Sequence, residues 1–281
     1  MIIEKADSPG FCFGVKRAIN LLEKTAREQG GIETLGAVVH NTQVLQGLAD
    51  SGIRTVKDID DIKGDTVATS SHGVSPQLNR QIRERNIDII NTTCPFVNRA
   101  QVSARRLTES GFFVIVYGDV NHPEIKGILG WANNNGIAAL DLDFLDTFKR
   151  IPRRFGILSQ TTQIPAHFTE FVKKVIDRTF TRDSEIRIID TICHDIRERQ
   201  AASLELANRV DLMLVIGGRS SANVNLLTEL CSTVTEAHLV ETTEDIDTSW
   251  LEGKEHIGVT GGASTPEETV DKVIAKLESM A

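Results

Sequence analysis

Short apolar runs rich in β-branched residues alternate with longer amphipathic runs along the whole chain. The short runs have the length and composition of buried strands, and the longer runs repeat their apolar residues at helical spacing. The strands expected from this pattern cover residues 34–39, 66–69, 87–91, 112–117, 137–140, 155–158, 186–189, 212–216, 237–240 and 256–259. The expected helices cover residues 75–85, 99–110, 165–178, 197–208, 223–232 and 266–280, and another begins near Val15. This alternation predicts an α/β fold with mostly parallel sheets.

A strand-to-helix junction that ends in cysteine recurs along the chain. Residues 87–94 read IDIINTTC and residues 186–193 read IRIIDTIC, and each segment then enters a helix that carries arginine. The opening stretch is a looser copy, in which an apolar-leaning run over residues 1–6 and a Pro-Gly turn lead to Cys12. The intervals of 82 residues from Cys12 to Cys94 and 99 residues from Cys94 to Cys193 each suit one small α/β unit. Such units could each present one cysteine at a common centre.

The repeat also predicts the division of the chain into domains. We expect one α/β unit over residues 13–94 and a second over residues 95–190. A third would combine residues 191–264 with residues 1–12, and a C-terminal helix would cover residues 265–281.

The three cysteines of the repeat point to a metal centre more than to a disulfide, because their number is odd and they lie far apart in the sequence. At the start of a helix, Cys12 would lie near backbone N–H groups and the positive end of the helix dipole, which favours thiolate. Zinc with three ligands and water suits such a set, and so does a [4Fe–4S] cluster with one open iron. The spacing does not choose between them. Cys231 lies within an expected helix, where we expect it to pack as a small apolar residue.

Small polar residues and histidines follow the expected strands. In open α/β sheets, ligands bind beyond the carboxyl ends of strands, and helix starts offer N–H groups to anions. Together these loops indicate a diphosphate held mostly by neutral donors and histidine. The alternative for each loop is a plain helix cap, such as the capping box expected at Thr265-Pro266-Glu267-Glu268. The loops cover residues 39–41, 70–75, 121–124, 159–162, 217–223 and 260–265.

Glu124 is the informative acid of these loops, since it follows His122 by two residues at an expected helix start. In a closed pocket near a metal it could move a proton. Its alternative role is that of a favourable carboxylate in a first helical turn. The histidines outside the loops are expected to be surface or packed residues: His167, His194, His238 and His256.

Composition narrows the class of protein. Of 281 residues, 31 are Lys or Arg and 39 are Asp or Glu, so the net charge is −8, and aromatic residues make up only 5%. These values argue against a broad nucleic-acid or anionic-membrane surface, and an anionic ligand therefore needs a local site. The first residues do not have the pattern of a signal peptide, and no apolar run has the length of a membrane span. We expect a cytoplasmic protein.

Taken together, the motifs resemble the 4-hydroxy-3-methylbut-2-enyl diphosphate reductase family, which catalyses the last step of the methylerythritol phosphate route to isoprenoids. The resemblance covers essentially the whole chain, and the order and number of the motifs make it specific. Its carriers are GFCFGV at 10–15, VHN at 39–41, SHGVS at 71–75, TCP at 93–95, HPE at 122–124, QTT at 160–162, IC at 192–193, SANVN at 221–225 and GASTP at 262–266.

This resemblance implies a fold, a cofactor and a reaction. It implies three α/β units arranged with pseudo-threefold symmetry around a central cavity. It implies one oxygen-sensitive [4Fe–4S] cluster per chain, held by Cys12, Cys94 and Cys193, with the apical iron binding the substrate hydroxyl oxygen. Two electrons and two protons would remove that hydroxyl as water and give isopentenyl or dimethylallyl diphosphate. A ferredoxin or flavodoxin would donate the electrons.

The resemblance also implies roles for the loop residues. Glu124 would supply protons, Thr161 would hydrogen-bond the substrate hydroxyl, and His122 would take part in both catalysis and binding. The residues implied to bind substrate are His40, His72, His122, Thr161, Ser221, Asn223 and Ser264. One departure is Ala222, where family members often have serine. A lost hydrogen bond to a charged group costs about 1.5–3 kcal/mol unless backbone or water replaces it.

Two other readings compete with the reductase. A zinc hydrolase would use the three cysteines as metal ligands and Glu124 as a base. A sensor of phosphorylated metabolites would bind the diphosphate without turnover. The set formed by His122, Glu124 and Thr161 argues against the sensor, because binding alone does not require it.

Overall fold

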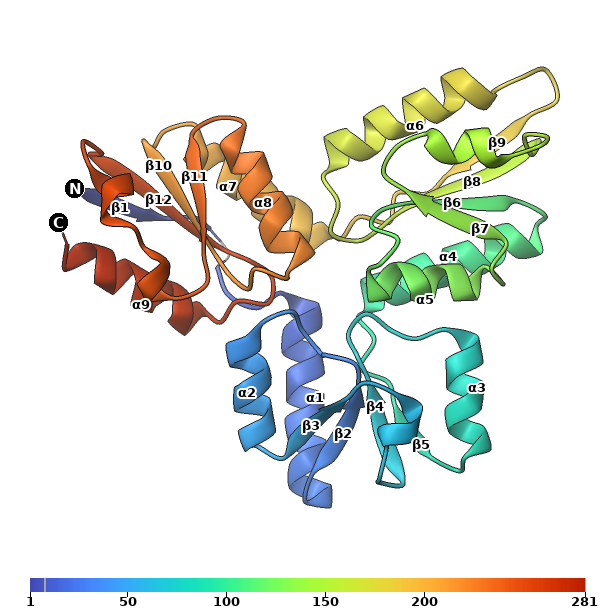
Figure 1. The fold of residues 1–281 in the computed structure, drawn as a ribbon, viewed down its shortest axis with the longest axis horizontal. Coiled ribbons are helices and arrows are strands. Elements are labelled where there is room, and N and C mark those ends of the chain that lie inside the picture. Colours follow the sequence, from blue (N-terminus) through green and yellow to red (C-terminus); the bar gives the residue numbers. More distant parts are fainter. Residues whose placement is uncertain (8, 281) are drawn as a thin grey trace. The chain divides into compact units, whose positions relative to one another are not determined.

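The structure is a computed structural model that describes residues 1–7 and 9–280, and it contains three four-stranded sheets with only parallel pairing (Figure 1). The predicted α/β class is confirmed. One sheet holds β2 (Ile32–Leu35), β3 (Ile53–Val56), β4 (Thr66–Thr69) and β5 (Asp88–Ile90). The next holds β6 (Phe113–Tyr117), β7 (Gly136–Ala139), β8 (Arg154–Ser159) and β9 (Glu185–Ile188). The last holds β10 (Leu212–Ile216), β11 (Glu236–Val240), β12 (His256–Gly261) and β1 (Ile2–Lys5).

Helices connect and cover these strands. They are α1 (Phe13–Gln29), α2 (Thr42–Asp50), α3 (Pro76–Glu84), α4 (Pro95–Glu109), α5 (Pro123–Trp131), α6 (Pro165–Thr179), α7 (His194–Ala207), α8 (Ala222–Ser232) and α9 (Glu267–Glu278). Short 3₁₀ turns are η1 (Ile59–Asp61), η2 (Asp143–Thr147), η3 (Thr243–Asp245) and η4 (Thr248–Leu251). None of the helices in the described part of the chain is both long and apolar enough to cross a membrane.

All three sheets have the same strand order. Counted from β2, β6 and β10, the order across each sheet is second, first, third, fourth. In the sheet that begins with β10, the N-terminal strand β1 takes the fourth place, beside β12. The weak sequence repeat therefore corresponds to a repeated topology. From the first strand the chain adds the second strand on one side and the third and fourth on the other, so the strand order reverses between the first and third strands. Ligands of open α/β sheets bind at the carboxyl ends of the two strands at such a reversal point.

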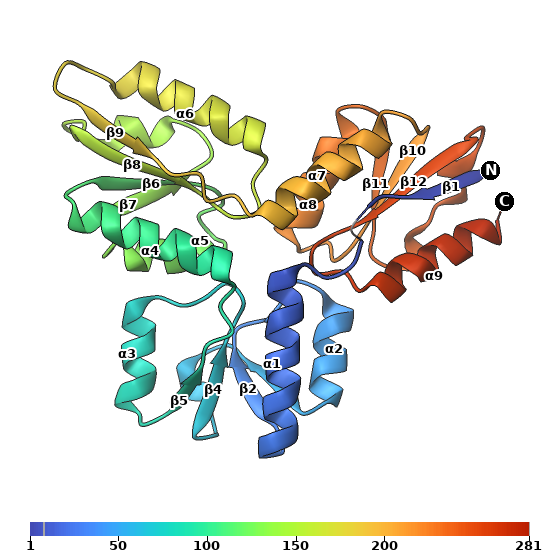
Figure 2. The same cartoon turned by 180° about the vertical axis from the view of Figure 1, so that it is seen from behind.

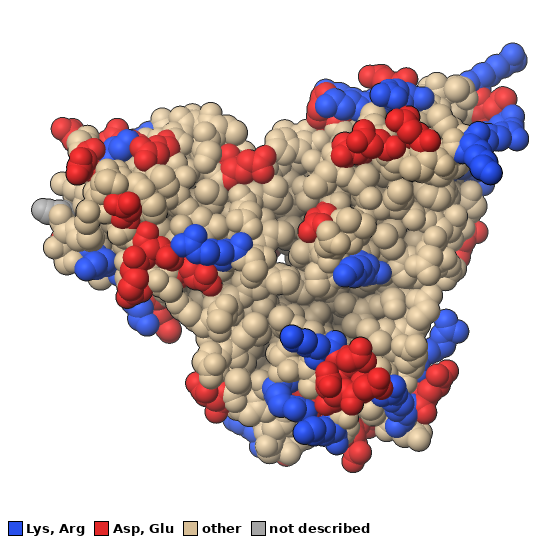
Figure 3. Space-filling view, viewed as in Figure 1, with Lys and Arg blue, Asp and Glu red and all other residues tan. Residues whose placement is uncertain are grey.

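The chain divides into two compact units. Unit 1 comprises residues 1–19, 39–51 and 194–281 and holds the sheet of β1 and β10–β12. Unit 2 comprises residues 20–38 and 52–193 and holds the other two sheets. On the face drawn in Figure 3, basic and acidic side chains lie interspersed, in keeping with the modest net charge.

Alternating side chains of the strands pack against helices on both faces of a sheet. In unit 1, Leu212 and Leu214 of β10 pack with residues of α9, whereas Met213 and Val215 pack with residues of α7 and α8. In unit 2, α4 and α5 cover one face of the sheet of β6–β9, and α6 covers the other (Figure 2). Central strands that are buried on both faces read as continuous apolar runs, which is why the sequence reveals them.

One local prediction was wrong, and two elements were missed. β2 ends at Leu35 because Gly36 adopts a φ of +81° that turns the chain away, although Val38 and Val39 beyond it are buried. The edge strand β3 and the helix α2 were not expected. β3 buries only its first and last residues, so it lacks an apolar run. α2 buries only Leu48, so its apolar stripe is too short to stand out.

Candidate active site

Each cysteine of the repeat lies between the fourth strand of a sheet and the helix that follows. Cys12 precedes α1, Cys94 precedes α4 and Cys193 precedes α7. In every case the cysteine N–H donates to the loop beyond the third strand of the sheet. The acceptors are Ala263 O for Cys12 at 3.0 Å, Ser71 O for Cys94 at 3.0 Å and Thr161 O for Cys193 at 2.9 Å. The same hydrogen bond thus fixes each cysteine beside a loop that carries a predicted substrate residue.

The predicted substrate residues all follow first or third strands. His40, His122 and the pair Ser221 and Asn223 come after the first strands β2, β6 and β10. The third strands β4, β8 and β12 lead to the remaining three: His72, Thr161 and Ser264. These residues therefore follow, in the sequence, the strands that flank the reversal point of each sheet, where ligands bind in such folds.

Glu124 is the most buried acid of unit 2, with 1% of its surface exposed. Its Oε1 accepts the backbone N–H of Thr161 at 2.7 Å, and its Oε2 accepts the Thr161 hydroxyl at 2.8 Å. Burial raises the pKa of the Glu124 carboxyl to about 7, and the two hydrogen bonds from Thr161 oppose that rise. A carboxyl with this pKa can both give and take a proton near neutral pH.

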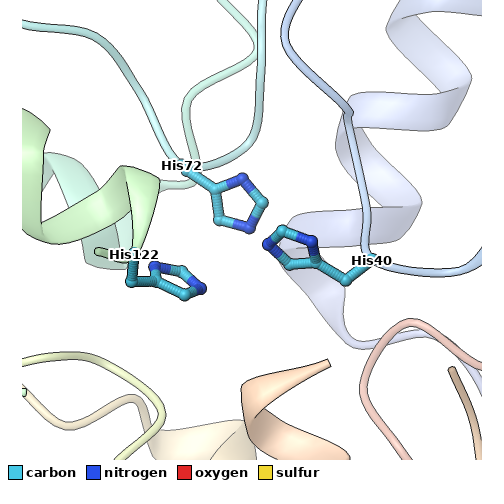
Figure 4. Close-up of side chains that lie close together, drawn as sticks. All are labelled: His40, His72 and His122. Carbon is cyan, nitrogen blue, oxygen red and sulfur yellow. The ribbon is translucent and has the colours of Figure 1, made fainter. Parts of the chain in front are cut away.

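His122 caps the helix that carries Glu124. Its Nδ1 accepts the N–H of Glu124 at 3.2 Å, and Pro123 occupies the first turn of α5, so Glu124 lies at a helix start as expected. The ring of His122 meets that of His72 edge to face, with centroids 5.2 Å apart and planes at 89° (Figure 4). The indole N–H of Trp131, at the end of α5, donates to Val74 O at 3.0 Å, which ties the His72 loop to this helix. Two predicted diphosphate ligands are thus held together in unit 2.

Gln160 is a residue whose role the sequence does not reveal. It is fully buried between the loops that follow β6 and β8. Its Oε1 accepts the N–H of Asp119 at 3.1 Å, its Nε2 donates to Thr162 Oγ1 at 3.2 Å, and its backbone N–H donates to Tyr117 O at 2.9 Å. Gln160 therefore fixes the Thr161 loop against the loop that leads to His122.

In unit 1, the predicted substrate side chains Ser221, Asn223 and Ser264 are buried. Ser221 directly precedes α8, and no capping bond to its hydroxyl is found in the described chain. Asn223 Nδ2 is buried without a hydrogen-bond partner among the described residues. Because buried donors rarely stay unpaired, this amide is suited to a polar ligand. The departure Ala222 is the first residue of α8 and is half-buried.

Gly218 allows the His40 loop to approach the loop between β10 and α8 closely. A β-carbon at Gly218 would lie 2.5 Å from His40 O, which real side chains do not permit. Glycine at position 218 is therefore required for this close approach. Asn41 caps α2 by accepting the N–H of Val44 at 3.1 Å, and burial lowers the pKa of His40. His40 thus favours the neutral ring, which can donate one hydrogen bond without a fixed charge.

The environment of Cys12 differs from the expectation of a readily formed thiolate. Hydrogen bonds from Val15 and Gly14 and the charge of Arg199 do lower the pKa of its thiol, but burial outweighs them and raises it. The helix start alone would lower the pKa of the Cys12 thiol, but the sequence does not show how deeply the thiol is buried. A bound metal ion would supply the charge that favours the thiolate form.

The structure also decides the predictions for Thr265 and Cys231. The capping box predicted at Thr265 is wrong, because its hydroxyl donates to Ile216 O at 2.9 Å and Pro266 stands at the cap position without a side-chain bond. The prediction for Cys231 is confirmed. It is fully buried within α8, and burial raises the pKa of its thiol to about 12. Such a thiol is not a ready metal ligand.

Comparison with known proteins places this chain in a family. The family model described as "LytB protein" matches residues 3–278. The chain belongs to the LytB family. A relative from Dehalococcoides mccartyi (strain CBDB1), named 4-hydroxy-3-methylbut-2-enyl diphosphate reductase, is 58% identical over 281 residues, which are 100% of this chain and 99% of the relative. A protein of the same name from Geobacter sulfurreducens is 38% identical over 282 residues, covering 99% and 97%.

Solved structures of LytB-type reductases share the fold. The E-1-hydroxy-2-methyl-but-2-enyl-4-diphosphate reductase from Plasmodium falciparum matches with a TM-score of 0.91 at 26% identity, over 98% of this chain and 87% of that chain. A structure described as (E)-4-hydroxy-3-methyl-but-2-enyl diphosphate reductase, the terminal enzyme of the non-mevalonate pathway, matches with a TM-score of 0.71 at 33% identity, covering 99% and 100%. The family resemblance predicted from the motifs is confirmed.

Proposed function

We propose that this chain is a 4-hydroxy-3-methylbut-2-enyl diphosphate reductase, which forms isopentenyl and dimethylallyl diphosphate in the last step of the methylerythritol phosphate pathway. The observation that carries the proposal is 58% identity over the whole chain to a reductase of that name. The residues that such a reductase needs also follow the first, third and fourth strands of the three sheets.

The cysteines suit an iron–sulfur cluster as its ligands. We propose that Cys12, Cys94 and Cys193 hold one [4Fe–4S] cluster, which when bound supplies electrons singly and leaves one iron open to substrate. Three thiols are the donor set for such a cluster, and each stands at the start of a helix, where N–H groups favour negative charge. Cys231 is not included, because it is packed inside α8.

The diphosphate would be bound mainly by groups without a fixed charge. We propose His40, His72 and His122 as imidazole ligands and Ser221, Asn223 and Ser264 as hydroxyl and amide ligands. The buried Nδ2 of Asn223, which lacks a partner among the described residues, supports this assignment. His122 is already held by the N–H of Glu124, which its Nδ1 accepts, so its ring needs little ordering on binding.

Glu124 and Thr161 form the proposed proton path. When Glu124 is protonated, its O–H donates to Thr161 Oγ1, and the Thr161 hydroxyl then donates to the oxygen of the substrate hydroxyl. When Glu124 is ionised, the Thr161 hydroxyl turns back to it, as in the structure. A carboxyl with a pKa of about 7 can be reprotonated between turnovers.

The overall reaction balances with two electrons and two protons. The C–O bond to the substrate hydroxyl breaks, and that oxygen leaves as water after taking one proton. The other proton bonds to carbon at either end of the allyl group, which gives the two product isomers.

We propose a ferredoxin or flavodoxin as the electron donor and the cytoplasm as the location. We also propose three repeat units, over residues 13–94, residues 95–190, and residues 191–264 with residues 1–12, followed by a C-terminal helix over residues 265–281.

Anaerobic purification followed by iron, sulfide and absorption analysis tests the cofactor. The proposal predicts about four iron and four sulfide per chain and a brown protein. Stoichiometric zinc in a colourless protein that does not accept a cluster on reconstitution would instead support a zinc hydrolase.

A further inference from the structure

Arg199 is a buried cation beside a proposed cluster ligand. It lies in α7 with 4% of its surface exposed, and it is the only lysine or arginine classed as buried among the described residues. Its Nη1 donates to Gly261 O at 2.6 Å, and its Nη2 donates to Gly10 O at 2.8 Å. Gly10 lies two residues before Cys12. Gly261 lies two residues before Ala263, whose carbonyl accepts the Cys12 N–H. The guanidinium therefore lies at the base of the Cys12 loop.

Two carbonyl groups accept from Nη1 and Nη2 of Arg199, and its Nε is buried without a hydrogen-bond partner among the described residues. Neutral carbonyls do not neutralise the charge of the guanidinium. In the described chain, the acidic groups that act on it electrostatically are the Cys12 thiol and Asp195. Asp195 Oδ2 already accepts the N–H of Phe13 at 2.9 Å, and no ion pair joins it to Arg199 in the part of the chain described. A buried charge is costly unless an opposite charge compensates it. Arginine does not escape this cost by losing its proton.

The repeat shows that helix packing does not require arginine here. The position six residues after each cysteine is buried in all three helices. It is alanine in α1 and α4, namely Ala18 and Ala100, and it is arginine only in α7. A small apolar side chain therefore fills this position in two of the three copies. The charge at the third calls for an explanation other than packing.

We propose that Arg199 is a positioning and charge-compensating residue, which stabilises the electron added at the Cys12 side of the cluster. This inference rests on the proposed function, because it requires a cluster on Cys12. A cluster bound by thiolates is anionic, and each electron makes it more so. A fixed cation in a buried site favours the reduced form and raises the reduction potential.

The test compares two substitutions at this position in the reconstituted protein. Arg199→Gln removes the charge but keeps amide N–H donors, whereas Arg199→Lys keeps the charge. Midpoint potentials are measured by anaerobic titration with dithionite, followed by electron paramagnetic resonance. We expect R199Q to shift the reduction equilibrium at least tenfold toward the oxidised cluster, which is 59 mV for one electron. R199K should stay within threefold of the parent.

The matched control is Arg209→Gln. Arg209 is exposed, lies in the same unit and pairs with Glu4 at 2.8 Å. R209Q should leave the potential unchanged, and a shift as large as that of R199Q would contradict a local effect. A parental potential in R199Q overturns the inference.

Iron content separates the remaining outcomes. If R199Q does not hold iron but R199K holds it at a parental potential, the charge is the required feature. Loss of iron from both variants overturns the proposal. It would show that the protein needs the hydrogen-bond geometry of the guanidinium and not its charge. A parent chain that holds no cluster contradicts the proposed function, and this inference with it, whereas a normal cluster with an unshifted R199Q contradicts the inference alone.

Discussion

The carboxyl of Glu124 gives a quantitative prediction that does not depend on turnover. Replacing it by glutamine keeps the shape of the side chain and removes its titration. Burial raises the pKa of Glu124 from 4.5 to about 7 in the folded protein, so the folded state holds its proton to higher pH than the unfolded state. The stability that this proton contributes is fully present below pH 4.5 and is lost as the pH rises through 7.

The size of the effect follows from the shift. Each pKa unit corresponds to 1.36 kcal/mol, so the parent should lose about 3 kcal/mol relative to E124Q between pH 4.5 and pH 8. The measurement is the free energy of unfolding of both metal-free proteins by urea at a series of pH values. Subtracting the two curves cancels the titration of all other groups.

The matched control is Glu170→Gln, an exposed residue of α6. Because this side chain is exposed, the substitution should not reproduce the difference curve of E124Q. A flat curve for E124Q, or one that rises with pH, would refute the buried, proton-holding carboxyl on which the proposed proton path depends.

Three further predictions concern the ligands, the proton path and the loop around His40. Cys12→Ser, Cys94→Ser and Cys193→Ser should each hold much less iron than the parent, whereas the control Cys231→Ser should hold as much. Parental iron content in any of the first three would remove that residue from the ligand set. Thr161→Val removes the hydroxyl that donates to Glu124 at 2.8 Å and should lower kcat about tenfold to a hundredfold, whereas the exposed control Thr169→Val should not. Gly218→Ala places a β-carbon against His40 O and should raise KM more than it lowers kcat, whereas Gly47→Ala, which has open space around it, should leave both unchanged.

The sequence predicted best those elements whose structure depends on consecutive residues. β4 and β10 have the predicted bounds because each is a short run of apolar or β-branched residues between polar or glycine-containing segments. The site residues could be grouped because strand ends of a parallel sheet share one edge, and the three cysteines because their junctions repeat. The order of motifs then indicated the family, which the family match confirms.

Features that depend on distant partners were not predictable in this way. Thr265 looks like a cap in the sequence, but its hydroxyl is taken by Ile216 O at the end of β10. The thiol of Cys12 looks activated by its helix, yet burial by the fold dominates its pKa. Arg199 looks like one more polar residue of an amphipathic helix, and only the tertiary structure shows it to be buried. Each of these depends on burial or a contact that local pattern does not encode.

The central claim is tested most directly by turnover. The anaerobically reconstituted protein, reduced by dithionite through a mediator, is incubated with 4-hydroxy-3-methylbut-2-enyl diphosphate, and the products are separated and quantified. The account predicts that both isopentenyl and dimethylallyl diphosphate form, with two electrons consumed per substrate molecule. A protein that carries its cluster and binds the substrate but releases neither product would contradict it.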